Sequence, residues 1–347
     1  MSQVQAHRVA RRGYLLGLAL AIVGAVFFSG KAIIGKLLYV EGIDALELVA
    51  LRMLLSAPFF ALVGLWAWSQ RPRPTAADAL RIAVLGLLGY YAASLLDFMG
   101  LQYITAGLER LILFLTPSIV LLLGMTFFGR RVSGLQWLSM AFAYAGIALV
   151  VQHDLSIGGD GVALGAGLVF GAAVSYGLYL LLSGEIVQRV GTLRLVSLAM
   201  IACAVATITH YALARPLPGL FEQSAAVWQL SGINAVLCTV LPVFLIMSAI
   251  ARIGAGVTAQ AGMMGPVSTL ALAWWILDEP VSGVQLAGTA LVLAGILLLY
   301  PVPALRRIPL RLAERMAETA ATNRQAVLFY VVGLFIVVPA VGVALLR

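Results

Sequence analysis

Apolar runs of about 20 residues recur along the whole chain, the length that crosses a bilayer as a helix. The runs are continuous rather than alternating, which excludes the strands of a β-barrel. They predict ten membrane spans joined by short connections: 14–36, 46–68, 80–100, 103–128, 134–152, 161–182, 194–214, 227–250, 256–277 and 281–301.

Two further segments follow the tenth span. Residues 303–324 carry five arginines among leucine and isoleucine, which predicts a basic amphipathic stretch at the membrane surface. Residues 326–346 form an additional candidate transmembrane helix. At the other end, the first apolar run has no Ala-x-Ala cleavage site, which favours an uncleaved helix over a signal peptide.

The chain contains a long internal repeat. Residues 104–150 align with residues 253–299 at a constant offset of 149 and without a gap. Identical pairs include Pro117 with Pro266 and Gln136 with Gln285. A period this long indicates two copies of a domain-sized unit. We therefore expect two five-helix copies, the first over residues 14–152 and the second over residues 161–301.

An odd number of spans per copy predicts that the second copy is inverted relative to the first. With a cytoplasmic N-terminus, 16 Lys and Arg residues fall on the inside and 3 on the outside. Arg130-Arg131 in the first copy takes the place of Asp278-Glu279, shifted by one residue, in the second. The predicted fold is an all-α polytopic membrane protein with a ten-helix inverted repeat (5+5) and one extra C-terminal transmembrane helix. Inverted repeats are associated with alternating access around a central site.

Composition excludes a soluble globule, because 62% of residues are hydrophobic, 10% are charged and the mean hydropathy is +1.04. The net charge of +8 lies in short clusters between apolar runs, so membrane orientation explains it better than nucleic acid does. Cys203 and Cys238 both lie in apolar runs, which supports neither a disulfide nor a zinc site.

Two matched interruptions mark a candidate site, Thr116-Pro117 in span four and residues 262–266, ending at Pro266, in span nine. Proline removes a backbone donor, so the freed carbonyls need partners or a wet cavity. Paired interruptions in corresponding spans are typical of transporter sites, although a packing kink is the alternative. Gln260 lies beside the second interruption and is a candidate cavity residue.

Five ionisable residues lie inside predicted spans, and all fall at a similar depth in the outer half of the bilayer: Lys31, Arg52, Asp97, Glu109 and Arg110. Each costs roughly 2.5–3.5 kcal/mol in lipid, so we expect them to face inward and pair. Their charge is three positive against two negative. We interpret them as a substrate-binding or gating network. The alternative is a structural salt-bridge cluster, with Lys31 reaching toward the outer surface.

Motifs for catalysis are absent from the sequence: it has no HExxH, GxSxG, Walker loop, dinucleotide fingerprint or metal-spaced His/Cys cluster. We therefore expect no enzyme activity, cofactor or metal, and a gradient as the driving force.

The repeats and several short motifs resemble the drug/metabolite transporter superfamily, specifically its EamA-type members. The resemblance covers about residues 14–300 and rests on the Ala-Gly…Pro…Glu-Pro-Val-Ser pattern around Pro266, on Phe28-Ser29…Lys36 and on Arg52. Phe28-Ser29 replaces the usual Trp-Gly, and Glu109-Arg110 replaces small residues. The resemblance implies ten helices, a central cavity and export of amino acids or other small metabolites, sometimes with proton exchange.

These observations predict a secondary transporter of the inner membrane, with its N-terminus in the cytoplasm. Its partners would be the lipid bilayer, a small polar metabolite such as an amino acid, and protons as a candidate coupling ion; no nucleic acid is expected. Two alternatives remain open: a carrier of anionic or phosphorylated solutes, and a non-transporting membrane scaffold or sensor.

Overall fold

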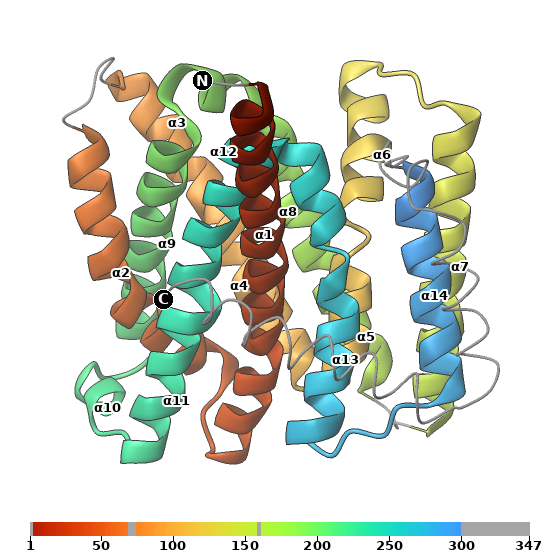
Figure 1. The fold of residues 1–347 in the computed structure, drawn as a ribbon. Helices are drawn as coiled ribbons and strands as arrows, with labels where there is room; N and C mark the ends of the chain where they lie inside the picture. Colours follow the sequence, from red (N-terminus) through yellow and green to blue (C-terminus); the bar gives the residue numbers. More distant parts are fainter. Residues whose placement is uncertain (1–2, 69–73, 158–160, 300–347) are drawn as a thin grey trace. The chain divides into compact units, whose positions relative to one another are not determined.

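The computed structural model describes residues 3–68, 74–157 and 161–299, and within these ranges every regular element is helical. Figure 1 shows the helices running side by side. Their bounds are α1 Gln3–Val40, α2 Ala45–Trp68, α3 Ala76–Gly86, α4 Ala93–Leu101, α5 Ala106–Leu113, α6 Thr116–Phe128, α7 Gly134–Ile157, α8 Val162–Val190, α9 Thr192–Ala214, α10 Pro218–Phe221, α11 Ala225–Ala235, α12 Leu241–Ala261, α13 Met264–Ile276 and α14 Gly283–Leu299.

Eight helical segments in the described part of the chain are long and apolar enough to cross a membrane: Gly13–Val40, Ala45–Trp66, Ala76–Leu101, Ala106–Phe128, Gly134–Ser156, Val162–Val190, Thr192–Ala214 and Ala225–Gly254. The predicted span nine is divided between the end of α12 and α13, and span ten corresponds to the shorter apolar helix Gly283–Leu298. The multi-pass helical class is confirmed, and the count of ten stays a prediction. The expected amphipathic stretch 303–324 and the extra helix 326–346 lie outside the described residues.

Two short π-helical segments occupy corresponding places in the two copies. The segment η1, Leu87–Ala92, joins α3 to α4, and η2, Val236–Val240, joins α11 to α12. They begin at the same offset of 149 that relates the repeated sequences. A π-segment inserts one residue into a helical turn and is often found near functional sites. Nothing in the residue pattern predicted these segments.

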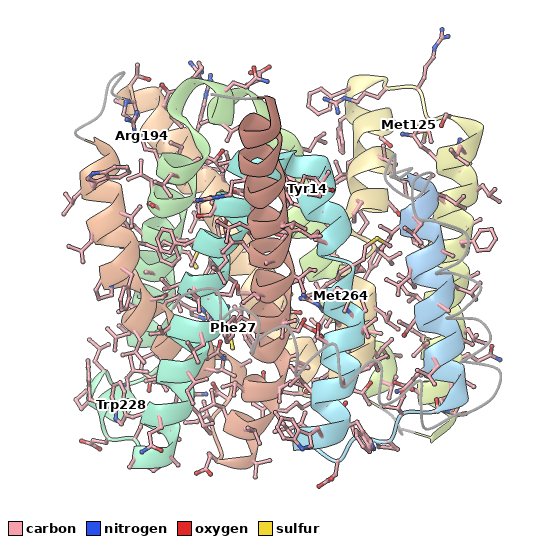
Figure 2. All side chains as sticks on the ribbon, viewed as in Figure 1. Tyr14, Phe27, Met125, Arg194, Trp228 and Met264 are labelled. Atoms are coloured by element: carbon pink, nitrogen blue, oxygen red, sulfur yellow. The ribbon has the colours of Figure 1, made fainter. Side chains whose placement is uncertain are left out.

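The predicted interruptions are real breaks in the helices. Before Thr116-Pro117 the chain leaves α5 and starts α6, so Pro117 lies in the first turn of α6, where its missing N–H is tolerated. The second break separates α12 from α13 and puts Pro266 near the start of α13. Figure 2 labels Met264, the first residue of α13, which packs beside α1.

Corresponding turns have the same capping chemistry. Ser133 and Gln136 exchange hydrogen bonds of 2.8 and 3.3 Å at the start of α7, and Ser282 and Gln285 do so at 3.2 and 3.1 Å at the start of α14. Such a capping box satisfies two backbone donors that a helix start leaves free. This explains why the serine and glutamine occur at equal spacing in both copies.

Helices from the two copies pack against each other: α1 with α12, α4 with α8, α2 with α9, and α7 with α14. The α7–α14 contact depends on small residues, since a Cβ on Gly146 would lie 2.6 Å from the Gly288 carbonyl oxygen. The Ser139 hydroxyl also donates across it to the Gly295 carbonyl, at 2.6 Å. Close backbone approach through small residues is typical of helix packing in membranes.

Candidate substrate site

The centre of the candidate site is an ion-pair network that joins three helices. Lys31 of α1 forms an ion pair and hydrogen bond with Asp97 of α4, and its Nζ lies 3.4 Å from Oε1 of Glu109 on α5. The three side chains are 8%, 3% and 1% exposed. One lysine is therefore shared by two buried carboxylates.

Arg110 connects this network to the second break. Its guanidinium lies between aromatic rings, 4.9 Å from the Phe28 centroid and 5.5 Å from the Phe114 centroid. Nη2 donates to the Ser29 hydroxyl at 3.4 Å, and that hydroxyl is 3.0 Å from the Gly265 carbonyl oxygen on α13. Cation–π contacts of this kind strengthen when the cation is removed from water.

Arg52 of α2 belongs to the same layer through a shared ring. Its Nη2 donates to Ser94 at 2.7 Å, and its guanidinium carbon lies 5.1 Å from the centroid of Phe98. The Lys31 ammonium lies 5.2 Å from that centroid. Phe98 therefore contacts two cations, and the structure brings all five predicted ionisable residues into one buried layer.

Several polar atoms in this layer have no hydrogen-bond partner among the described residues: Arg52 Nε, Asp97 Oδ1, both Glu109 carboxylate oxygens and Arg110 Nε. Unpaired polar atoms in an apolar interior cost free energy, and charged ones cost more. The layer also contains three cations and two carboxylates, all buried. It therefore has both the atoms and the excess positive charge to accept a polar ligand.

The interruption residues have their own partners. The Thr116 hydroxyl donates to the Leu113 carbonyl at 2.6 Å, and the Gly265 carbonyl accepts from Thr269 at 3.0 Å. Pro266 is buried beside Gly265. These bonds satisfy carbonyls near the breaks. Gln260 lies in α12, and its side chain is outside the described residues.

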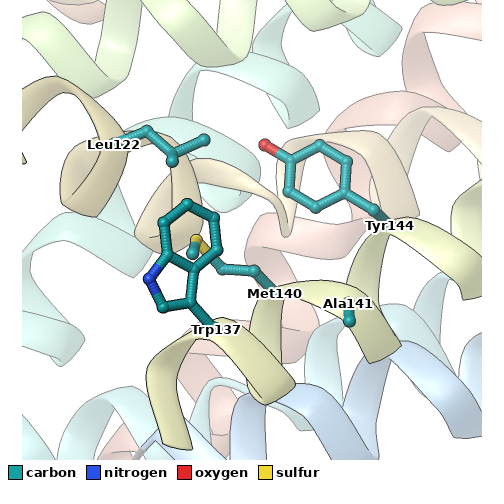
Figure 3. Close-up of a pocket in the computed structure, with 5 residues that line it drawn as sticks. All are labelled: Leu122, Trp137, Met140, Ala141 and Tyr144. Carbon is teal, nitrogen blue, oxygen red and sulfur yellow. The ribbon is translucent and has the colours of Figure 1, made fainter. Parts of the chain in front are cut away.

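A cavity among the described residues lies elsewhere. It has a volume of about 220 Å³, lies between α6 and α7, and is lined by Leu122, Trp137, Met140, Ala141 and Tyr144 (Figure 3). None of the candidate residues lines it. The wet central cavity expected from the interruptions stays a prediction, and the charged layer is closed to solvent in this conformation.

Sequence reasoning missed the neutral members of the site, which are Phe28, Ser29, Ser94, Phe98 and Phe114. Phe98 follows Asp97 directly and Ser94 precedes it by about one helical turn, so helical spacing around each charged residue was the available signal. Whether the layer binds a substrate stays a prediction.

Glu279 forms another polar contact between the copies, beyond the end of α13. Its carboxylate accepts the backbone N–H of Ala106, at 3.1 and 3.3 Å, at the start of α5. Burial raises the pKa of Glu279, while the Ala106 hydrogen bond and the positive charge of Lys36 oppose that rise. The carboxylate caps a helix N-terminus, where negative charge is favoured.

A model of the EamA-like transporter family matches residues 15–152 and, a second time, residues 163–300. The chain belongs to the EamA-like transporter family.

Three curated relatives come from Bacillus subtilis (strain 168). The uncharacterized transporter YcbK is 29% identical over 78% of this chain and 88% of its own length. The uncharacterized transporter YyaM is 26% identical over 63% of this chain and 72% of its own length. The uncharacterized transporter YetK is 24% identical over 81% of this chain and 84% of its own length. A solved crystal structure with 16% identity matches 82% of this chain and 95% of its own, with a TM-score of 0.58, which supports the fold alone. The predicted family is confirmed, and the protein is a multi-pass membrane protein of a transporter family.

Proposed function

We propose that this protein is a secondary active transporter that exports small polar metabolites, such as amino acids, across the inner membrane by alternating access. The observation that carries the proposal is the buried layer of Lys31, Asp97, Glu109 and Arg110 where α1, α4 and α5 meet the break before α13. Ionisable residues are expensive in membrane interiors and are usually kept there for function.

The proposed architecture is a ten-helix inverted repeat with a cytoplasmic N-terminus. The matched π-segments, matched capping boxes and paired helix contacts between copies support it. Five spans per copy would then give the two copies opposite orientations. Movement of one copy against the other would separate Arg110 and Ser29 from Gly265. The charged layer would open to one side of the membrane.

The charges of the layer fit a solute that carries both signs. The buried arginines can donate to a carboxylate. The Glu109 carboxylate oxygens have no hydrogen-bond partner among the described residues and can accept from an ammonium group. A buried carboxylate such as Glu109 can also take up and release a proton, which makes the proton the candidate coupling ion. The excess of one positive charge supports the second candidate, a carrier of anionic or phosphorylated solutes.

Flux into proteoliposomes tests the proposal. Purified protein is reconstituted and counterflow of labelled amino acids, phosphorylated metabolites and other small solutes is measured. Glu109→Ala and Arg110→Ala are each expected to abolish flux while membrane insertion stays intact, and Arg131→Ala, in an exposed turn, is the control. Wild-type flux in both variants removes the pair from the mechanism. Absence of any flux in the wild type, with capture of a partner protein, favours the scaffold.

A further inference from the structure

A second group of buried polar atoms lies on α2 and α11 and includes Arg52 of the charged layer. Ser56, Ser231 and Asn234 are at most 1% exposed, and Arg52 is 6% exposed. The Ser56 and Ser231 hydroxyls, both amide atoms of Asn234 and Nε of Arg52 have no hydrogen-bond partner among the described residues. Five unpaired atoms in four buried side chains are too many to leave without an occupant.

Helix spacing puts the residues of each pair on one face of their own helix. Arg52 and Ser56 are four residues apart on α2, and Ser231 and Asn234 are three apart on α11, so each pair shares one helix face. α2 and α11 pack against each other, and α1 packs against α11. The thiol of Cys238, one turn beyond Asn234, is near enough to the Arg52 guanidinium to interact with it electrostatically.

The pseudosymmetric counterpart of this surface, between α3 and α9, is apolar. At the offset of 149, Ser231 and Asn234 correspond to Ile82 and Leu85; at the offset of 147 that relates α2 to α9, Arg52 corresponds to Ala199. Ile82, Leu85 and Ala199 belong to one apolar cluster. The α3–α9 pair therefore packs with apolar residues at these positions, and its counterpart, the α2–α11 pair, carries Arg52, Ser231 and Asn234 there.

The chemistry of the group selects an anion. Arg52 forms no ion pair with a described residue, so its charge is not neutralised within the part of the chain that the structure describes. Its Nε–H, the Asn234 amide and the two hydroxyls are all able to donate. An arginine fork with amide and hydroxyl donors is suited to a carboxylate.

We propose that Arg52, Ser56, Ser231 and Asn234 form the subsite that binds the carboxylate of the transported solute. The proposal rests on the transport function proposed above, and it names the chemical group that every substrate must carry. Arg52 also contacts Phe98, the ring that borders Lys31. A carboxylate at Arg52 therefore places the rest of the solute toward the Lys31–Asp97–Glu109 network.

The test compares acids with amines that lack the carboxylate. The purified wild type is titrated with L-alanine against ethylamine and with L-phenylalanine against 2-phenylethylamine, and thermal unfolding is followed. At least one acid is expected to raise the Tm. The matching amine is expected to bind with an apparent affinity at least tenfold lower. Asn234→Leu, which installs the residue of the first copy, is expected to weaken the response to the acid at least tenfold. Thr207→Val, a buried change whose hydroxyl bonds only within its own helix region, is the control and is expected to respond as the wild type.

A second variant guards against failure of the first to fold. Asn234→Asp has nearly the same shape and puts a carboxylate into the proposed subsite, so it is expected to raise the Tm without ligand and to abolish the response to the acid. The proposal is overturned if neither acid stabilises the wild type, if acid and amine act equally, or if either Asn234 variant keeps the wild-type response. If Asn234→Leu keeps the wild-type response and is more stable than the wild type, water alone occupies this group of polar atoms. Flux separates the two proposals: binding of the acid without flux contradicts the transporter, and flux with an unchanged KM in Asn234→Leu contradicts only the subsite.

Discussion

The guanidinium of Arg110 lies directly against the backbone of Gly265, a residue of the other copy. A Cβ on Gly265 would lie 2.7 Å from Nη2 and 3.1 Å from Nε of Arg110. Gly265→Ala should therefore push the guanidinium away from Ser29 and from the break before α13. Because misplacing a functional group by about 1 Å can cost roughly a hundredfold in rate, we expect tenfold to hundredfold slower flux in proteoliposomes.

Gly167→Ala is the matched control, because nothing lies within 4 Å of a Cβ at that helical position in α8. It should transport as the wild type. Equal flux in Gly265→Ala and Gly167→Ala would show that the contact between Arg110 and the break has no role in transport.

Removal of Lys31 alone should destabilise the protein more than removal of Lys31 and Asp97 together. Lys31→Met leaves two buried carboxylates without their shared cation, and breaking a buried pair costs about 3–5 kcal/mol. Lys31→Met/Asp97→Leu removes one of those carboxylates and should recover part of the loss. Thermal unfolding in detergent of Lys31→Met, of Asp97→Leu and of the double variant gives the coupling energy between the two residues. Additive losses would contradict the shared network.

The sequence was sufficient to group the five charged residues because relative depth follows from residue counting along the predicted spans. Lys31 and Asp97 come late in their spans while Arg52, Glu109 and Arg110 come early, and the structure brings them together. The partners of each charge could not be predicted in this way, because helix rotation decides them. Phe98 contacts both Arg52 and Lys31 only because α4 turns that face toward α1 and α2.

The π-segments and the group around Asn234 escaped prediction for a different reason. A π-segment is one extra residue in a turn, and leucine, glycine, cysteine and threonine in such a turn are compatible with ordinary helix as well. Asn234 is a single polar residue in an apolar span, and its burial without a partner becomes visible only when neighbouring helices are placed.

Glu279 should make stability depend on pH near and above its ordinary pKa of 4.5. Burial is the largest cause of its shift and raises the pKa, so the folded protein holds this proton more tightly than the unfolded chain does. The resulting contribution to stability is complete below the ordinary pKa and is lost as the pH rises through the raised one. Glu279→Gln lacks this titration. The Tm of the wild type minus that of Glu279→Gln should therefore fall as the pH is raised from 4 to 8, and a constant difference would contradict the assignment.

The turns after α6 and after α13 should face opposite sides of the membrane. They share a backbone conformation, since Gly129 has φ 60° and Asp278, at the offset of 149, has φ 53°. They differ in charge, with Arg130-Arg131 in one and Asp278-Glu279 in the other, as the bias of basic residues toward the cytoplasm requires of inverted copies.

Arg131→Cys and Pro280→Cys place thiols at exposed positions in these turns, whereas Cys203 and Cys238 are buried, so the wild type serves as the unlabelled control. A membrane-impermeant maleimide applied to intact cells should label Pro280→Cys, and Arg131→Cys should react only after the membrane is opened. Labelling of both from the same side would mean that the copies are parallel, and the alternating movement of inverted halves around the Arg110–Gly265 contact would lose its basis.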